Sequence, residues 1–129
     1  MGFKILSAKE FNIKLKCSLH ASGKLGFTEE TAKRLQFSDN SAVKFALDEE
    51  DQSVLYLFNS KIADEDSFKV NKAGSYFYVN AKAMFDMLGY DYANNSIMFD
   101  MIEIKNNENE IYKLNKREKP RKQKDNIKE

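Results

Sequence analysis

The sequence predicts a β-rich α+β fold in which two copies of a strand–strand–helix–strand–strand (ββαββ) unit pack into one compact pseudo-two-fold barrel or sandwich. Three observations predict this fold. Short segments alternate apolar and polar residues with period two, which is typical of half-buried strands. In each copy a glycine turn joins the first two strands, and a short segment with helix signals follows. The same order then recurs about fifty residues later.

The first unit covers about residues 12–58. Apolar and polar residues alternate from Ile13 to His20, which predicts a strand with one buried face. Gly23 can take positive φ and turn the chain. Thr28 is an expected helix N-cap, and the two glutamates after it complement the helix dipole. We expect strands at 12–20, 24–27, 43–47 and 54–58, and a helix at 28–36.

The second unit covers about residues 68–112. Gly74 takes the place of Gly23, Asn80 is the expected helix cap, and Gly89 ends the helix. We expect strands at 68–71, 75–79, 97–104 and from 110 onward, and a helix at 80–88. Since neither unit alone buries both faces of its strands, two units packed together would close a barrel or sandwich with few exposed edges.

The chain as a whole divides into one folded domain and a tail. Residues 1–112 hold the apolar segments, and hydrophobic residues make up 42% of the chain, enough for a core. Residues 113–129 are basic, and the run 116–124 within them has no apolar anchor except the ring of Pro120, so we expect a disordered tail there. No apolar run has the roughly 18 residues of a membrane span, and the first residues do not resemble a secretion leader. We therefore expect a cytoplasmic protein with no membrane partner.

Charge is distributed unevenly along the chain. Residues 1–45 carry eight Lys/Arg against four Asp/Glu, residues 46–112 five against thirteen, and residues 113–129 eight against three. The net charge of +1 therefore conceals a basic, an acidic and again a basic segment. Such a distribution predicts separate basic and acidic surfaces.

A run in the first unit has a familiar order: Gly23 to Glu30, Leu35, Phe37, residues 38–40, and Val43 to Phe45. This run resembles the AbrB/MazE-type swapped-hairpin module, in which a glycine, a basic residue, alternating apolar residues, a short helix ending in leucine and a polar turn precede another strand. The resemblance implies two interleaved units, DNA binding by basic residues near the first hairpin, and a transcription-regulatory or antitoxin-like role. Thr28 and Asn80 stand where that family usually has proline.

Catalytic constellations are not visible in the sequence. His20 is the sole histidine and Cys17 the sole cysteine, so neither a zinc set of the usual kind nor an intramolecular disulfide can be built from one chain. The acidic runs 48–51 and 64–66 lack the spacing of a calcium loop and are interpreted as solvated turns. We therefore expect a non-enzymatic protein without metal or cofactor.

Basic residues carry the functional prediction. Alternation places Lys14 and Lys16 on one strand face, with Lys24 across the hairpin and Lys33 and Arg34 on the following helix. The predicted phosphate-binding residues are Lys14, Lys16, Lys24, Lys33, Arg34, Lys116, Arg117, Lys119, Arg121, Lys122 and Lys124.

The leading hypothesis is a nucleic-acid-binding or transcription-regulatory module that contacts DNA or RNA through phosphates. Two alternatives remain open. The acidic balance of residues 46–112 favours a protein–protein interaction or assembly domain, because an acidic surface repels nucleic acid. A hydrolase with an unidentified carboxylate site is the third hypothesis. The sequence does not predict the oligomeric state.

Overall fold

The computed structural model describes residues 2–6, 8, 14–60, 62–104 and 109–121 of the chain. The described part is rich in β-structure and contains two six-residue helices. Its elements are β1 (Leu15–Leu19), β2 (Lys24–Phe27), α2 (Glu29–Arg34), β3 (Ala42–Leu47), β4 (Leu55–Asn59), β5 (Phe68–Lys69), β6 (Asn71–Ala73), β7 (Tyr76–Asn80), α3 (Lys82–Met87), β8 (Asn95–Ile104) and β9 (Ile111–Pro120). Strands and helices thus lie close to the segments where the sequence predicts them.

The strands form a nearly closed antiparallel barrel. They follow one another in one sheet in the order β5-β3-β4-β9-β8-β1-β2-β7-β6. The two edge strands, β5 and β6, are consecutive in the chain and are separated only by Val70. Val70 is fully buried, and its amide donates a hydrogen bond of 2.9 Å to the carbonyl of Ser41. This segment pairs with β3 at one end and β7 at the other, so it brings the two edges together. The predicted barrel is confirmed.

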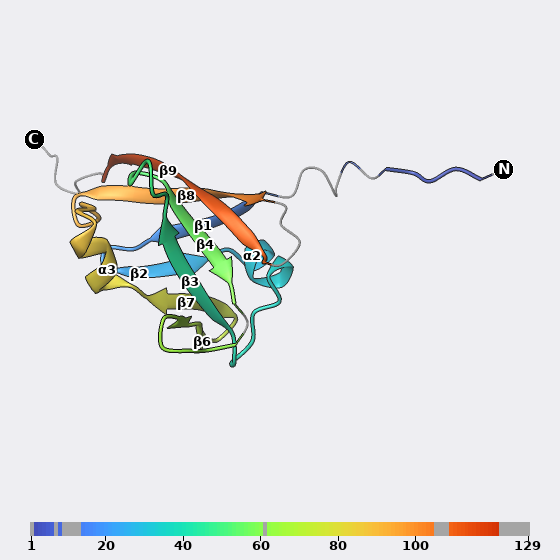
Figure 1. Ribbon diagram of the computed structural model, residues 1–129, viewed down its shortest axis with the longest axis horizontal. Coiled ribbons are helices and arrows are strands. Elements are labelled where there is room, and N and C mark those ends of the chain that lie inside the picture. Colours follow the sequence, from blue (N-terminus) through green and yellow to red (C-terminus); the bar gives the residue numbers. More distant parts are fainter. Residues whose placement is uncertain (1, 7, 9–13, 61, 105–108, 122–129) are drawn as a thin grey trace, which may run out of the picture.

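The barrel interior is filled by one apolar cluster with aromatic residues at its centre. Phe85 from α3 contacts Phe99 of β8 and Phe45 of β3, with ring centroids 6.2 and 6.3 Å apart. Figure 1 shows α2 and α3 at opposite ends of the barrel. No helix in the described ranges has the length and apolar character needed to cross a membrane.

The two helices differ in how they begin. The Thr28 hydroxyl accepts a hydrogen bond from the amide of Thr31, so Thr28 caps α2 as predicted. The predicted cap of α3 is wrong, because Asn80 is the last residue of β7 and the N-cap position is Ala81, which has no side-chain cap. Gly23 and Gly74 both have positive φ at their hairpin turns, as the sequence predicts.

Strand β9 corrects the prediction of a disordered tail. The sequence predicts disorder from Lys113, but the strand continues to Pro120 and pairs with β8 as far as Asn95. Ladder hydrogen bonds hold this segment although its residues 115–120 are exposed, so an apolar anchor is not needed. Residues 122–129 lie outside the described part of the chain.

Candidate nucleic-acid interface

Strand register places side chains from five strands on one outer surface of the barrel. Directly opposite residues of paired strands point to the same side of a sheet. One continuous row of such partners crosses the surface from β9 to β7: Arg117, Met98, Ser18, Gly26 and Tyr78. The row faces outward, because Cys17, Leu25 and Phe99, which alternate with its members, are fully buried.

We call this outward surface of β9, β8, β1, β2 and β7 the basic face. Its cations come from three strands that are far apart in the sequence. They are Lys14 and Lys16 before and on β1, Lys24 on β2, and Lys113, Arg117 and Lys119 on β9. The sequence prediction that Lys14, Lys16 and Lys24 share one face is therefore confirmed.

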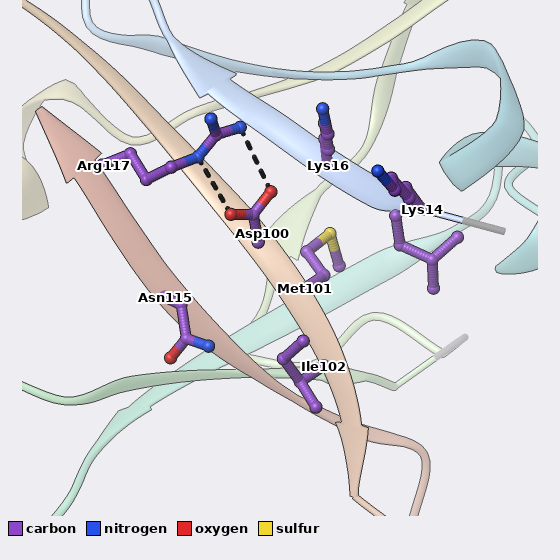
Figure 2. A pocket seen from close by; sticks show the side chains of 8 residues that line it. Lys14, Lys16, Asp100, Met101, Ile102, Asn115 and Arg117 are labelled. Atoms are coloured by element: carbon purple, nitrogen blue, oxygen red, sulfur yellow. Dashed lines mark hydrogen bonds and ion pairs between the residues drawn. The ribbon is translucent and has the colours of Figure 1, made fainter. Parts of the chain in front are cut away.

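A hollow of about 410 Å³ lies on the basic face where β1, β8 and β9 run side by side. Figure 2 shows Lys14 and Lys16 along one side of it and Arg117 and Asn115 along the other, with Asp100 of β8 between them. The Arg117 guanidinium binds the Asp100 carboxylate through two contacts, at 2.9 and 3.2 Å. This two-point contact fixes the guanidinium on the surface next to the two lysines.

The backbone of Lys16 is fixed by helix α2. Its amide donates a hydrogen bond of 2.8 Å to the Thr31 hydroxyl oxygen, and that hydroxyl donates back to the Lys16 carbonyl at 3.0 Å. The amide of Thr28 also donates to this carbonyl, at 3.3 Å. Thr31 is fully buried, so the helix joins β1 at the residue that presents the lysine side chain.

Two tyrosines form the aromatic part of the basic face. The rings of Tyr76 and Tyr78 on β7 stack with their centroids 5.8 Å apart and an interplanar angle of 21°. The ammonium of Lys24 lies 4.8 Å from the centroid of the Tyr78 ring, in a cation–π contact. The Tyr76 hydroxyl shares a hydrogen bond of 2.5 Å with His20 Nε2.

His20 therefore lies on the basic face, beside Tyr76. Desolvation at this position lowers the pKa of the imidazole, and the positive charges of Arg121 and Lys24 lower it further. The neutral ring is thus favoured beside Tyr76. In the described part of the chain, no group of three or more His, Cys, Asp or Glu side chains is placed to hold a metal ion.

Several predicted phosphate-binding residues lie elsewhere. Arg34 binds Glu103 at 2.9 Å, and Lys33 lies 3.8 Å from Glu29 on the same helix. Lys116 points to the other side of β9, where its ammonium lies 4.6 Å from the Tyr90 ring centroid and 3.5 Å from Glu118.

Arg121 follows β9 and has a structural contact of its own. Its guanidinium donates to the carbonyl of Tyr92, at 2.8 and 3.0 Å. Lys122 and Lys124 lie outside the described residues. Of the five cations predicted around the first hairpin, Lys14, Lys16 and Lys24 thus share the basic face, and Lys33 and Arg34 each form an ion pair.

The two acidic runs of the sequence, the turn 48–51 and the loop 64–66, lie on another wall of the barrel. We call this wall, with β3 and β4, the acidic hairpin. In Figure 1 this hairpin crosses in front of β1 and β2. Lys44 on β3 binds Asp64 at 2.6 Å, and this contact lowers the pKa of the Asp64 carboxyl. In sheet order, β9 separates the hairpin from β8 and the rest of the basic face.

Sequence reasoning missed Lys113, Asn115, Tyr76 and Tyr78 as members of the basic face. Alternation along residues 76–80 already indicated that the two tyrosines share one side of a strand. The pairing of β7 with β2, which brings them next to Lys24, joins segments about fifty residues apart and has no local signal.

Comparisons of the chain with models of protein families, with curated proteins and with solved structures find no match. The resemblance to AbrB/MazE-type proteins therefore stays a prediction. The arrangement of the basic face is the starting point for a functional proposal.

Proposed function

We propose that this chain is a non-enzymatic nucleic-acid-binding or regulatory module that binds phosphates with its basic face. One observation carries the proposal: cations from β1, β2 and β9 share a single outward surface, while the acidic turn and loop belong to the acidic hairpin. A chain of net charge +1 can thereby present a positive surface to a polyanion.

The hollow between β1 and β9 suits a phosphate group. Lysine ammoniums bind phosphate as point charges, and a guanidinium held in a fixed plane offers paired donors. Lys14 and Lys16 supply the ammonium groups around one hollow. Arg117 binds Asp100 through Nε and Nη2, so it would meet the phosphate with the side of the guanidinium that Asp100 does not contact. Binding of this kind releases counterions, so its affinity falls steeply with salt and depends little on base sequence.

The test is fluorescence anisotropy with labelled DNA at about 50 mM and about 200 mM salt. We expect Lys16→Glu to weaken binding and to reduce the slope of log affinity against log salt by about one. Lys44→Glu is the matched control, since Lys44 is an outward lysine on the acidic hairpin and should leave both quantities unchanged. An affinity that does not depend on salt, or equal effects of the two variants, would contradict the proposal.

We also propose that the barrel is an internal duplication with the swapped-hairpin arrangement of AbrB/MazE-type proteins. The strand order supports the duplication when the two-residue strand β5 is set aside and β3 and β6 are taken as the neighbours that close the circle. Exchanging β1–β4 for β6–β9, element by element, then gives the same circular order in the opposite direction. A two-fold axis perpendicular to the barrel axis has this effect. Such an axis would pass between β4 and β9 and between β2 and β7, and in each of these antiparallel pairs the exchange replaces one strand by the other.

The duplication is tested by a crystal structure in which residues 15–59 are superimposed on residues 71–120. We expect the two backbones to follow the same path through all four strands and the helix. Unrelated paths, or a rotation far from two-fold, would contradict the duplication and leave the phosphate-binding proposal untouched.

A further inference from the structure

We infer that the nucleic acid is single-stranded and that its bases stack on the Tyr76–Tyr78 pair. This inference rests on the proposed function, in which the basic face binds the phosphates. It adds the class of ligand and a second kind of contact, between aromatic rings and bases.

The tyrosine pair has the position of a stacking platform. Both rings lie on the outward side of β7, and Tyr76 is 37% exposed. The pair lies beside cations, with the Lys24 ammonium at the Tyr78 ring. Proteins that bind single strands combine these two elements, since aromatic rings stack on bases of any sequence and basic side chains follow the backbone.

Gly26 leaves the room that the Tyr76 side chain needs in its observed position. Gly26 lies within β2 and has no positive φ, so the backbone conformation does not require a glycine here. A glycine in a strand can instead allow another group to approach the backbone closely. A Cβ at this position would overlap the Tyr76 hydroxyl group and lie 2.8 Å from His20 Nε2. The phenol end of Tyr76 therefore lies over the backbone of β2, where His20 holds it by a hydrogen bond. A ring fixed in this way loses little conformational entropy when a base stacks on it.

A duplex fits this surface poorly. The major groove admits a helix or a two-stranded ribbon, whereas the basic face is one wall of a barrel made from five strands. The two helices are six residues long and carry three cations between them, Lys33, Arg34 and Lys82. Duplex bases also stack on each other, so they are not available to tyrosine rings, whereas the bases of a single strand are.

A single strand can contact the platform and the hollow together. From β7 to β9 the basic face crosses four inter-strand spacings, roughly 19 Å at the usual separation. This distance suits about four nucleotides, at the lower end of the site sizes found for single-strand-binding barrels. Bases would stack at Tyr76 and Tyr78 while phosphates contact Lys24, Lys16 and Arg117 in turn.

The experiment measures the affinity of three labelled probes by anisotropy: oligo-dT and oligo-U of about ten nucleotides, and a duplex of the same length. We expect the wild-type chain to bind both single strands more tightly than the duplex. Tyr76→Leu and Tyr78→Leu should each weaken single-strand binding on the order of tenfold without changing the salt slope, because a stacking contact carries no charge. Tyr76→Phe and Tyr78→Phe should keep most of the affinity.

Tyr56→Leu is the matched control, since Tyr56 is an outward tyrosine on the acidic hairpin. Cross-linking of the wild-type chain to 5-iodo-deoxyuridine DNA, mapped by mass spectrometry, needs no variant and should label Tyr76 or Tyr78. Three results would overturn the inference and leave the proposed function standing. These are a duplex that binds as tightly as the single strands, leucine variants that keep full affinity for the single strands, and cross-links found only at residues other than Tyr76 and Tyr78. Failure of all three probes to bind would remove both proposals.

Discussion

The basic face and the acidic hairpin use the same residue types in opposite ways. Each presents a lysine and a tyrosine at outward strand positions. On the acidic hairpin, Lys44 binds Asp64 at 2.6 Å and the Tyr56 hydroxyl donates to Asp48 at 3.3 Å. On the basic face, Lys24 instead lies against the ring of Tyr78. Neighbouring loops account for the difference, because carboxylates of the turn and loop bind Lys44 and Tyr56. On the basic face the charge of the turn acts on Lys113, at the edge next to β4.

Among the substitutions that test this comparison, we expect Gly26→Ala to have the largest effect on folding stability. The new Cβ forces the Tyr76 ring to swing away and breaks its hydrogen bond to His20. We expect a loss of about 1 kcal/mol in the free energy of unfolding, the usual cost of one such bond. Urea denaturation measures this cost, and NMR titration should show the pKa of His20 moving back toward its ordinary value.

The control for this variant is Ala46→Ser on the acidic hairpin. Ala46 is an outward residue of β3, opposite Tyr56, and substitutions of this kind usually change stability by less than about 0.5 kcal/mol. Equal stability losses in the two variants, or an unchanged His20 titration in Gly26→Ala, would contradict the role given to Gly26.

We expect a smaller change in folding stability when His20 is protonated at low pH. Its pKa is lowered in the folded chain, mainly by desolvation. Above the ordinary pKa of about 6.5 the ring is neutral in both states and contributes no pH dependence. As the pH falls through about 6.5, the unfolded chain takes up the proton first, so folding stability decreases until the folded-state pKa is reached. Solvent screening at this mostly exposed ring keeps the change below about 1 kcal/mol.

His20→Gln isolates this contribution, since the chain has no other histidine. Urea denaturation at about pH 7.5 and about pH 5 should show that the wild-type chain loses more stability on acidification than the variant does. The same loss in both, or a gain in the wild-type chain, would show that the Tyr76–His20 contact does not disfavour the charged ring.

Much of the fold could be predicted from local pattern. Period-two alternation located β1 and β3, and the glycine turns at Gly23 and Gly74 were expected from their freedom to take positive φ. The second half of β9 could not be predicted, because its exposed polar residues depend on ladder hydrogen bonds to β8 rather than on an apolar face. Its charges resembled those of a disordered tail.

The candidate site was predicted in part: Lys14, Lys16 and Lys24 of the first hairpin, and Arg117 and Lys119 of the basic run, lie on the basic face. Alternation alone placed Lys14 and Lys16 together. The Arg34–Glu103 ion pair and the Lys24–Tyr78 contact join residues far apart in the chain, so they depend on register that no local pattern encodes. For the same reason the ion pair of Arg34 was not predicted, and the tyrosines were left out of the phosphate-binding patch.

The most direct test of the account is an NMR titration of the ¹⁵N-labelled chain with a short single-stranded oligonucleotide at low salt. We expect amide shifts to change on β1, β2, β7, β8 and β9, with the largest changes near Lys16, Gly26 and Tyr78. Amides of β3 and of the 48–51 turn should stay in place and serve as the internal control. Changes centred on the acidic hairpin, or no changes at all, would contradict the assignment of the basic face as the nucleic-acid interface.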